Sequence, residues 1–196
     1  MRKICVLIGS RANYSSIKNV LIEIKKNKKL KLIIIVFSSA VLEKYGRVSD
    51  LIKSDGFKIE EEIFNHLDGE TPLTMSKSTG LAIIELSSAF NKCKPVVVLT
   101  VGDRYETIAT AISSTYLNIS LAHTMGGEVT GTIDESIRHA ITKFAHIHFP
   151  ASKDAYERII KLGEIKKNVF LVGCPRIDEV KKILSKKTSI MDIEKK

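Results

Sequence analysis

The sequence predicts an α/β fold with a doubly wound, Rossmann-like parallel sheet. Apolar runs of strand length alternate with amphipathic stretches of helix length along the 196 residues, which is the pattern of a parallel sheet covered on both faces. The run Leu32–Phe37 contains no polar residue, as expected for a central strand that is buried on two sides. With 44% hydrophobic residues, the chain can bury the core of one large domain.

The predicted strands are short apolar runs, and the first of them ends at Gly9. That first run is too short for a signal-peptide core or a membrane span, so we interpret it as a strand. The following runs have 4 to 8 residues and are mainly apolar, and the run at 58–64 is the weakest of them. The full set of predicted strands is 3–8, 30–37, 58–64, 96–101, 119–122, 146–149 and 169–172.

The predicted helices lie between these runs, and one of them has clear boundary signals. Thr71 precedes Pro72, and threonine is a good N-cap while proline is tolerated in the first helical turn. Pro95 then ends this helix after Lys94. The full set of predicted helices is 15–26, 41–54, 72–93, 105–116, 133–144 and 152–162.

Charge and cysteine content limit the function classes. The formal net charge is +9, but the lysines are scattered and only 6% of the residues are aromatic, so we expect no nucleic-acid surface. We also expect no membrane partner. Cys5, Cys93 and Cys174 have neither metal-ligand nor redox spacing, and they suit a reducing cytoplasm.

In open parallel sheets the ligand lies at the carboxyl ends of the strands, so the residues that follow each strand are the candidate site. The first loop lacks the GxGxxG fingerprint, and we therefore expect no nicotinamide cofactor. His146 and His148 share a strand face but have no third ligand at suitable spacing, so no metal site is predicted. Four segments follow predicted strands and carry polar residues: 9–15, 102–104, 123–139 and 173–175.

Three of these segments have simple alternative explanations. Arg11 suits phosphate oxygens, although a plain surface turn would also account for it. Asp103 and Arg104 place a carboxylate and a guanidinium at a strand end, where a salt bridge or helix cap is an equal alternative. Cys174 precedes a proline and has no nearby base, so we interpret its segment as a structural turn.

The segment 123–139 carries the most chemistry. Gly126 and Gly127 can let the backbone approach a ligand, and the helix that begins near Thr132 offers unpaired N–H groups to an anion. Paired carboxylates with different environments can supply an acid and a base near neutral pH. Helix-stabilising pairs would also explain these charges. The remaining candidate residues of the segment are His123, Glu128 and the i,i+4 pairs Asp134–Arg138 and Glu135–His139.

These residues resemble the hydrolysing UDP-N-acetylglucosamine 2-epimerases. The resemblance covers nearly the whole chain and is most specific in the thirteen-residue run 131–143. Further matching motifs are the segments 11–14, 102–104, 123–128 and 173–178.

The resemblance implies the first domain of a glycosyltransferase-B type fold, in which two Rossmann-like domains hold the substrate between them. We expect residues 1–180 to form the amino-terminal domain and residues 181–196 to form a tail toward an absent second domain, supplied in cis or in trans. The resemblance also leads us to expect a homo-oligomer.

The chemistry implied by the resemblance is elimination of UDP to a 2-acetamidoglucal, followed by addition of water to give N-acetylmannosamine. It requires no metal and no other cofactor. The carboxylates of Asp103, Glu128, Asp134 and Glu135 would transfer protons or bind sugar hydroxyls, with Asp103 and Asp134 the stronger candidates. The residues implied in substrate binding are Arg11, Arg104, His123, Gly126, Gly127, Arg138 and His139.

Two positions depart from the family pattern and leave the substrate open. Met125 stands where some members have glutamate, and Asn13 stands where an acidic residue is common. UDP-N-acetylglucosamine, of sialic acid synthesis, and a UDP-linked 2,4-diacetamido-2,4,6-trideoxy sugar, of legionaminic acid synthesis, are both candidate substrates. A non-catalytic domain that only binds nucleotide sugars is the alternative from another class.

Overall fold

The computed structural model describes residues 1–102 and 104–185. Its centre is a sheet of six parallel strands, in the order β3-β2-β1-β4-β5-β6. The order reverses direction between β1 and β4, as in other doubly wound sheets. The predicted fold class is therefore confirmed. The strands are β1 (Arg2–Ile8), β2 (Leu30–Phe37), β3 (Glu61–Ile63), β4 (Val97–Val101), β5 (Ser120–Thr124) and β6 (Ile147–Phe149).

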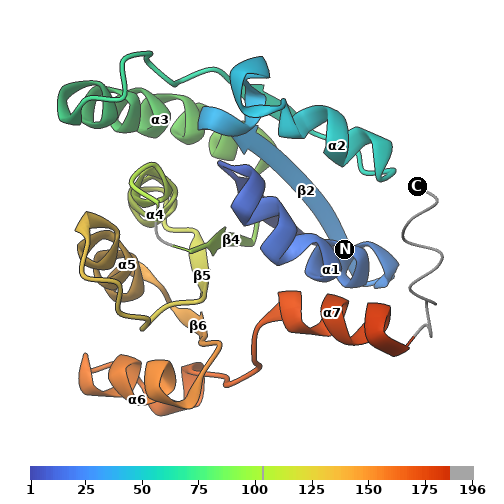
Figure 1. Ribbon diagram of the computed structural model, residues 1–196, viewed down its shortest axis with the longest axis vertical. Coiled ribbons are helices and arrows are strands. Elements are labelled where there is room, and N and C mark those ends of the chain that lie inside the picture. The colour runs from blue at the N-terminus through green and yellow to red at the C-terminus, as the bar shows by residue number, and fades with distance from the viewer. Residues whose placement is uncertain (103, 186–196) are drawn as a thin grey trace.

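Both faces of the sheet are covered by helices (Figure 1). Successive side chains of a strand point to opposite faces, so Cys5 and Leu7 of β1 lie in one apolar core while Val6 and Ile8 lie in the other. The first core is closed by α3 (Pro72–Cys93), α4 (Thr107–Tyr116) and α5 (Ile133–Phe144). The second is closed by α1 (Arg11–Lys26) and α2 (Val48–Ser54), and α6 (Lys153–Lys161) lies beyond β6.

The ends of α3 follow the local chemistry that the sequence predicts. The Thr71 side chain accepts a hydrogen bond from the Thr74 amide, and the Thr74 side chain accepts one from the Thr71 amide, which forms a capping box. Pro72 occupies the first turn, and Lys94 ends the helix in a left-handed conformation with φ 48°. These contacts fix the loop that leads from β3 to α3.

Two predicted elements differ in the structure. Residues 169–172 form no strand: Val169 makes a single bridge to His148, and the side chains that follow remain about half exposed. The predicted helix 41–54 is divided into two 3₁₀ turns, Ser38–Val41 and Glu43–Tyr45, and the short α2. Gly46 and Arg47 separate them with positive φ angles of 76° and 31°, which an α-helix cannot accommodate.

An additional helix, α7 (Pro175–Ser185), packs against α1 and was not predicted. Pro175 begins it, and proline suits a first helical position because its missing N–H needs no partner there. The predicted boundary between residues 180 and 181 falls inside this helix. Residues 186–196 of the predicted tail lie outside the described residues.

Candidate active site

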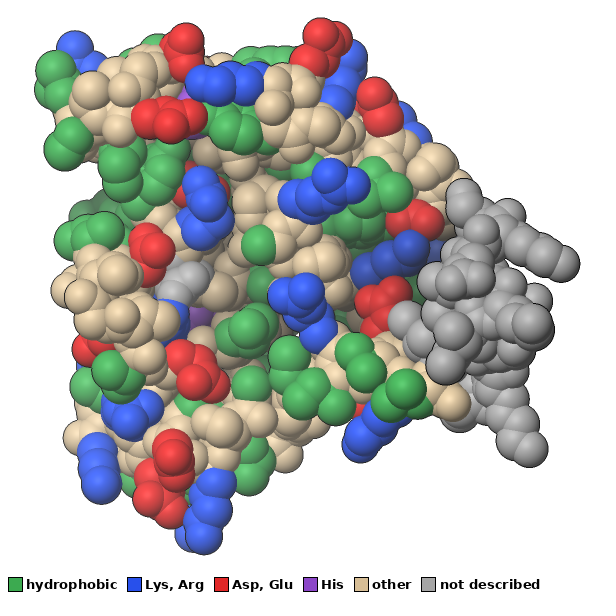
Figure 2. All heavy atoms as spheres, viewed as in Figure 1, with side chains coloured by type: hydrophobic (Ala, Val, Ile, Leu, Met, Phe, Trp, Pro, Cys, Tyr) green, Lys and Arg blue, Asp and Glu red, His purple; other side chains and the backbone are tan. Residues whose placement is uncertain are grey.

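A cavity of about 480 Å³ lies at the carboxyl edge of the sheet. Loops that follow β2, β3 and β4 line it together with the first turn of α5, as expected for a ligand site in an open parallel sheet. The face viewed in Figure 1 is hollowed between α3 and α5, with acidic and basic side chains on the rim (Figure 2). The polar lining residues are Ser39, Tyr45, His66, Glu70, Thr74, Arg104, Tyr105 and Asp134.

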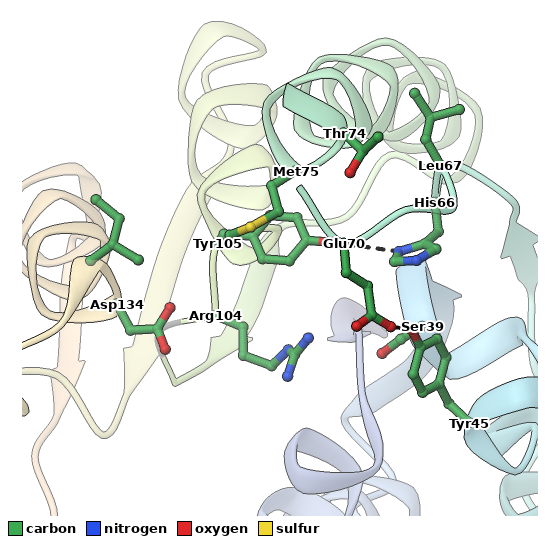
Figure 3. Close-up of a pocket in the computed structure, with 11 residues that line it drawn as sticks. Ser39, Tyr45, His66, Leu67, Glu70, Thr74, Met75, Arg104, Tyr105 and Asp134 are labelled. Atoms are coloured by element: carbon green, nitrogen blue, oxygen red, sulfur yellow. Dashed lines mark hydrogen bonds between the residues drawn. The ribbon is translucent and has the colours of Figure 1, made fainter. Parts of the chain in front are cut away.

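Two predicted site residues, Arg104 and Asp134, meet in this cavity although they are thirty positions apart in the sequence. In Figure 3 the Arg104 guanidinium lies between the carboxylates of Asp134 and Glu70. Asp134 stands in the first turn of α5, where the helix dipole favours its negative charge. Asp103, the other strong candidate, lies outside the described residues.

Glu106 contacts the cavity-lining residue Arg104 from the interior, and the sequence analysis did not identify it. Its carboxylate is fully buried, and Oε1 accepts a hydrogen bond from Nε of Arg104 at 2.8 Å. Burial raises the pKa of Glu106, and Arg104 opposes that rise only in part. The signal in the sequence was its place two residues after Arg104, at the same strand end. Glu106 thus connects the cavity to the protein interior.

His123 lies inside the protein, and its predicted contact with the substrate stays a prediction. The side chain is fully buried, and burial lowers its pKa to about 4. Its Nε2 lies 2.9 Å from the carbonyl oxygen of Gly102, so the neutral ring carries its proton on Nε2. Thr142 Oγ1 lies 3.3 Å from Nδ1. His123 therefore fixes the backbone at the end of β4.

The space beside Gly126 and Gly127, where a side chain would lie, is occupied by neighbouring protein atoms. A Cβ added at Gly126 would lie 2.9 Å from Nδ1 of His123. A Cβ at Gly127 would lie 2.4 Å from the carbonyl oxygen of Ala155 in α6, and this residue has a positive φ of 80°. Close packing alone therefore requires glycine at both positions, and their predicted substrate contact stays a prediction.

Glu135 holds the loop before α5. Its Oε2 accepts hydrogen bonds from the amides of Gly131 at 2.7 Å and Thr130 at 2.8 Å, and these bonds lower its pKa. Its Oε1 lies 3.8 Å from Nε2 of His139, so the predicted i,i+4 pair is present. Neither side chain is among the cavity-lining residues.

Arg138 and Glu128 are joined through the backbone. The Arg138 side chain is almost fully buried, and Nη1 donates to the carbonyl oxygen of Glu128 at 2.6 Å. The Glu128 carboxylate accepts a hydrogen bond from Oγ of Ser152 at 3.4 Å, at the start of α6. These contacts hold the segment that follows the two glycines.

The first turn of α1 contributes an exposed arginine and a buried amide. Arg11 lies beside the 3₁₀ turn that carries Tyr45. A Cβ built on Gly46, which ends that turn, would be 3.6 Å from Nη1 of Arg11. Asn13 accepts a hydrogen bond from the Gly9 amide at 3.2 Å and donates one to the Val101 carbonyl at 3.1 Å. A carboxylate cannot make the second bond, which explains the departure at this position.

The two histidines of the 146–149 segment have protein partners. His146 Nδ1 accepts from the Leu121 amide at 3.2 Å, and His148 Nε2 lies 3.3 Å from Glu164. Within residues 1–102 and 104–185, no three His, Cys, Asp or Glu side chains gather as a metal site would require. None of the helices in that same part of the chain has the length and apolarity to cross a bilayer.

Known proteins support the same family. A family model described as UDP-N-acetylglucosamine 2-epimerase matches residues 22–196. A UDP-N,N'-diacetylbacillosamine 2-epimerase (hydrolyzing) of Legionella pneumophila is 37% identical over 98% of this chain and 50% of its own length. A UDP-N-acetylglucosamine 2-epimerase of Neisseria meningitidis is 31% identical over 91% of this chain and 46% of its own length.

Solved structures agree on the fold. The UDP-GlcNAc 2-epimerase of Neisseria meningitidis, bound to UDP-GlcNAc, superposes with a TM-score of 0.81 at 20% identity, over 98% of this chain and 52% of that one. The chain spans about half the length of the curated relatives it matches. By sequence and by fold, it belongs to the UDP-N-acetylglucosamine 2-epimerase family.

Proposed function

We propose that the protein supplies the amino-terminal half of a hydrolysing UDP-sugar 2-epimerase. The observation that carries this proposal is the meeting of Arg104 and Asp134 in one cavity at the carboxyl edge of the sheet, in a chain of this family. A guanidinium and a carboxylate on one wall can bind an oxygen-rich ligand and move a proton at the same time.

The proposed reaction has two steps. A base removes the proton at C2 of the sugar, the electron pair forms the C1–C2 double bond, and the bond between C1 and the diphosphate oxygen breaks to release UDP. Water then adds its hydroxyl group to C1 of the 2-acetamidoglucal, and an acid returns a proton to C2 on the opposite face. The products are UDP and a free N-acetylmannosamine-type sugar.

Asp103 and Asp134 are proposed as the base and the acid, in either order. Asp134 lines the cavity, and no hydrogen bond joins its carboxylate to another of the described residues, which leaves it available to a substrate. Glu128 and Glu135 are proposed to support proton transfer or to bind sugar hydroxyls. Arg11, at the start of α1, is proposed to position the diphosphate or to orient these carboxylates.

Arg138 and His139 are proposed to orient the carboxylates and the diphosphate from α5. Arg138 already holds the backbone of the segment 126–128 through the Glu128 carbonyl. His139 lies beside Glu135, and its ring nitrogen Nδ1 has no hydrogen-bonding partner within residues 1–102 and 104–185. Arg138 and His139 thus contact residues on either side of Asp134 in the sequence, Glu128 and Glu135.

Two substrates are proposed. UDP-N-acetylglucosamine fits the family as a whole, and the product would then be N-acetylmannosamine, a precursor in sialic acid synthesis. The relatives from Legionella pneumophila and Campylobacter jejuni, each 37% identical, are named for UDP-N,N'-diacetylbacillosamine. They favour a 2,4-diacetamido-2,4,6-trideoxy sugar, as in legionaminic acid synthesis.

The proposal also includes a second domain, in cis or in trans, because the chain spans about half of its relatives. We further propose a cytoplasmic homo-oligomer, in keeping with the expectations from the sequence. The same half-length coverage favours one competing function, a domain that binds a nucleotide sugar without turnover.

Proton NMR in D₂O tests the proposal. The chain, alone and then together with the second domain of the Legionella relative, is incubated with each UDP-sugar while UDP and C2 deuterium are followed. We expect UDP and a C2-deuterated free sugar, and a loss of at least ~10²-fold in rate for Asp103→Asn and Asp134→Asn. Asp154→Asn in α6 is the matched control.

Two outcomes would contradict the proposed enzyme. Bound nucleotide sugar without any UDP release, in both preparations, would establish the binding domain. Near-normal rates in Asp103→Asn and Asp134→Asn would remove the two carboxylates from the mechanism.

A further inference from the structure

The two side chains of the ion pair Arg104–Glu106 differ sharply in their exposure to solvent. Arg104 lines the cavity with 44% of its side chain exposed, whereas Glu106 is 0% exposed. The two are joined by a single contact, from Nε of Arg104 to Oε1 of Glu106 at 2.8 Å. One end of the pair is thus anchored in the interior while the other end faces the site.

The carboxylate of Glu106 packs against Gly9, in the loop that follows β1. A Cβ built on Gly9 would lie 3.2 Å from Oε1 and 3.3 Å from Cγ of Glu106, and 3.1 Å from a ring carbon of Phe37. The missing side chain at Gly9 therefore leaves the space that Glu106 fills. The carboxylate has little freedom to move, and it fixes the atom that it binds.

The contact to Glu106 uses only one of the five N–H groups of the guanidinium. Among the described residues, none makes a hydrogen bond with the two terminal nitrogens of Arg104. The guanidinium projects between Asp134 and Glu70 in the cavity (Figure 3). A planar fork fixed at its Nε is already oriented for oxygen acceptors, so little rotamer freedom is lost on binding.

We propose that Glu106 is a positioning residue, which orients Arg104 so that its terminal N–H groups bind the UDP-sugar in the cavity. This inference rests on the proposed function, because the bound ligand is the proposed substrate. Stability alone is a poor explanation of the pair, since the second carboxylate oxygen, Oε2, is buried with no partner among the described residues. A buried carboxylate that is only partly compensated destabilises a fold.

Isothermal titration calorimetry of the chain with the two UDP-sugars tests the inference. The variants are Glu106→Gln, Arg104→Gln and the double variant. The control is Glu62→Gln on β3, which removes the carboxylate charge from the ion pair of Glu62 with Lys53 of α2. We expect Glu106→Gln and Arg104→Gln each to weaken binding roughly 10-fold or more, the worth of a charge-assisted hydrogen bond. The double variant should bind no more weakly than Arg104→Gln, because Glu106 acts through Arg104.

The ¹⁵N resonance of the Arg104 Nε–H group gives a readout that does not depend on ligand. It should shift in Glu106→Gln and stay unchanged in Glu62→Gln. An unchanged resonance in Glu106→Gln, affinity equal to wild type in that variant, or additive losses in the double variant would each overturn the positioning role. If the wild-type chain binds neither UDP-sugar while the resonance shifts as expected, the proposed ligand is wrong and the Arg104–Glu106 pair stands without a substrate role.

Discussion

Replacing Gly127 with alanine should destabilise the fold more than any ordinary surface change. Gly127 follows β5 at the point where the chain passes α6, and its φ is 80°. A Cβ there would lie 2.4 Å from the backbone oxygen of Ala155 and 2.9 Å from Cγ1 of Ile159. The first of these is a backbone atom within a helix, so it cannot move aside without shifting α6.

Two effects add up in this variant. A left-handed backbone conformation costs an L-residue about 1–2 kcal/mol, and overpacking of a closely packed site costs about 1–3 kcal/mol. The expected loss in the free energy of unfolding is therefore about 2–5 kcal/mol. Gly131 is the matched control, because its φ is 72° and a Cβ there meets nothing within 4 Å. Only the backbone cost applies to Gly131→Ala.

Urea denaturation followed by circular dichroism measures both variants under one set of conditions. Gly127→Ala should unfold at a clearly lower urea concentration than Gly131→Ala. Equal midpoints for the two variants would refute the packing argument, and they would return Gly127 to its predicted role as a glycine that makes room for a ligand.

Three further predictions concern the polar contacts around the site. Because burial lowers the pKa of His123 from 6.5 to about 4, its contribution to stability is complete above pH 6.5 and is lost as the pH falls toward 4. The loss is roughly 2 kcal/mol between pH 7 and pH 5, and urea midpoints of His123→Gln should lack it. Asn13→Asp should cost about 1–3 kcal/mol, because a buried carboxylate cannot donate to the Val101 carbonyl; an unchanged melting temperature would contradict this. Glu135→Ala should speed hydrogen exchange of the amides at 130–131, and unchanged exchange there would show that Glu135 does not hold the loop.

Much of the fold follows from local sequence pattern. The apolar runs identify the inner strands, such as β1 and β2, because their side chains are buried on both faces of the sheet, and the cap at Thr71 fixes the start of α3. The strand predicted at 169–172 is wrong, because this run pairs with the sheet only at Val169 and its next three apolar side chains remain about half exposed. The missed helix α7 begins at a proline that resembles a turn until its packing on α1 is known.

The candidate site was predictable in part, for a physical reason. Position after a strand brings Arg104 and Asp134 to one edge of the sheet, and the topology alone ensures this. Burial is decided by tertiary packing, so the sequence could not distinguish Glu106 from a surface acid. For the same reason the sequence could not show that His123 is buried and that burial lowers its pKa.

The measurement that tests the central claim most directly is a map of backbone amide shifts in the presence of each UDP-sugar. We expect the largest shifts at the residues that line the cavity, around Arg104 and Asp134, with Asp134→Asn reducing affinity. Shifts confined to the opposite edge of the sheet, or no shifts at millimolar ligand, would contradict the account.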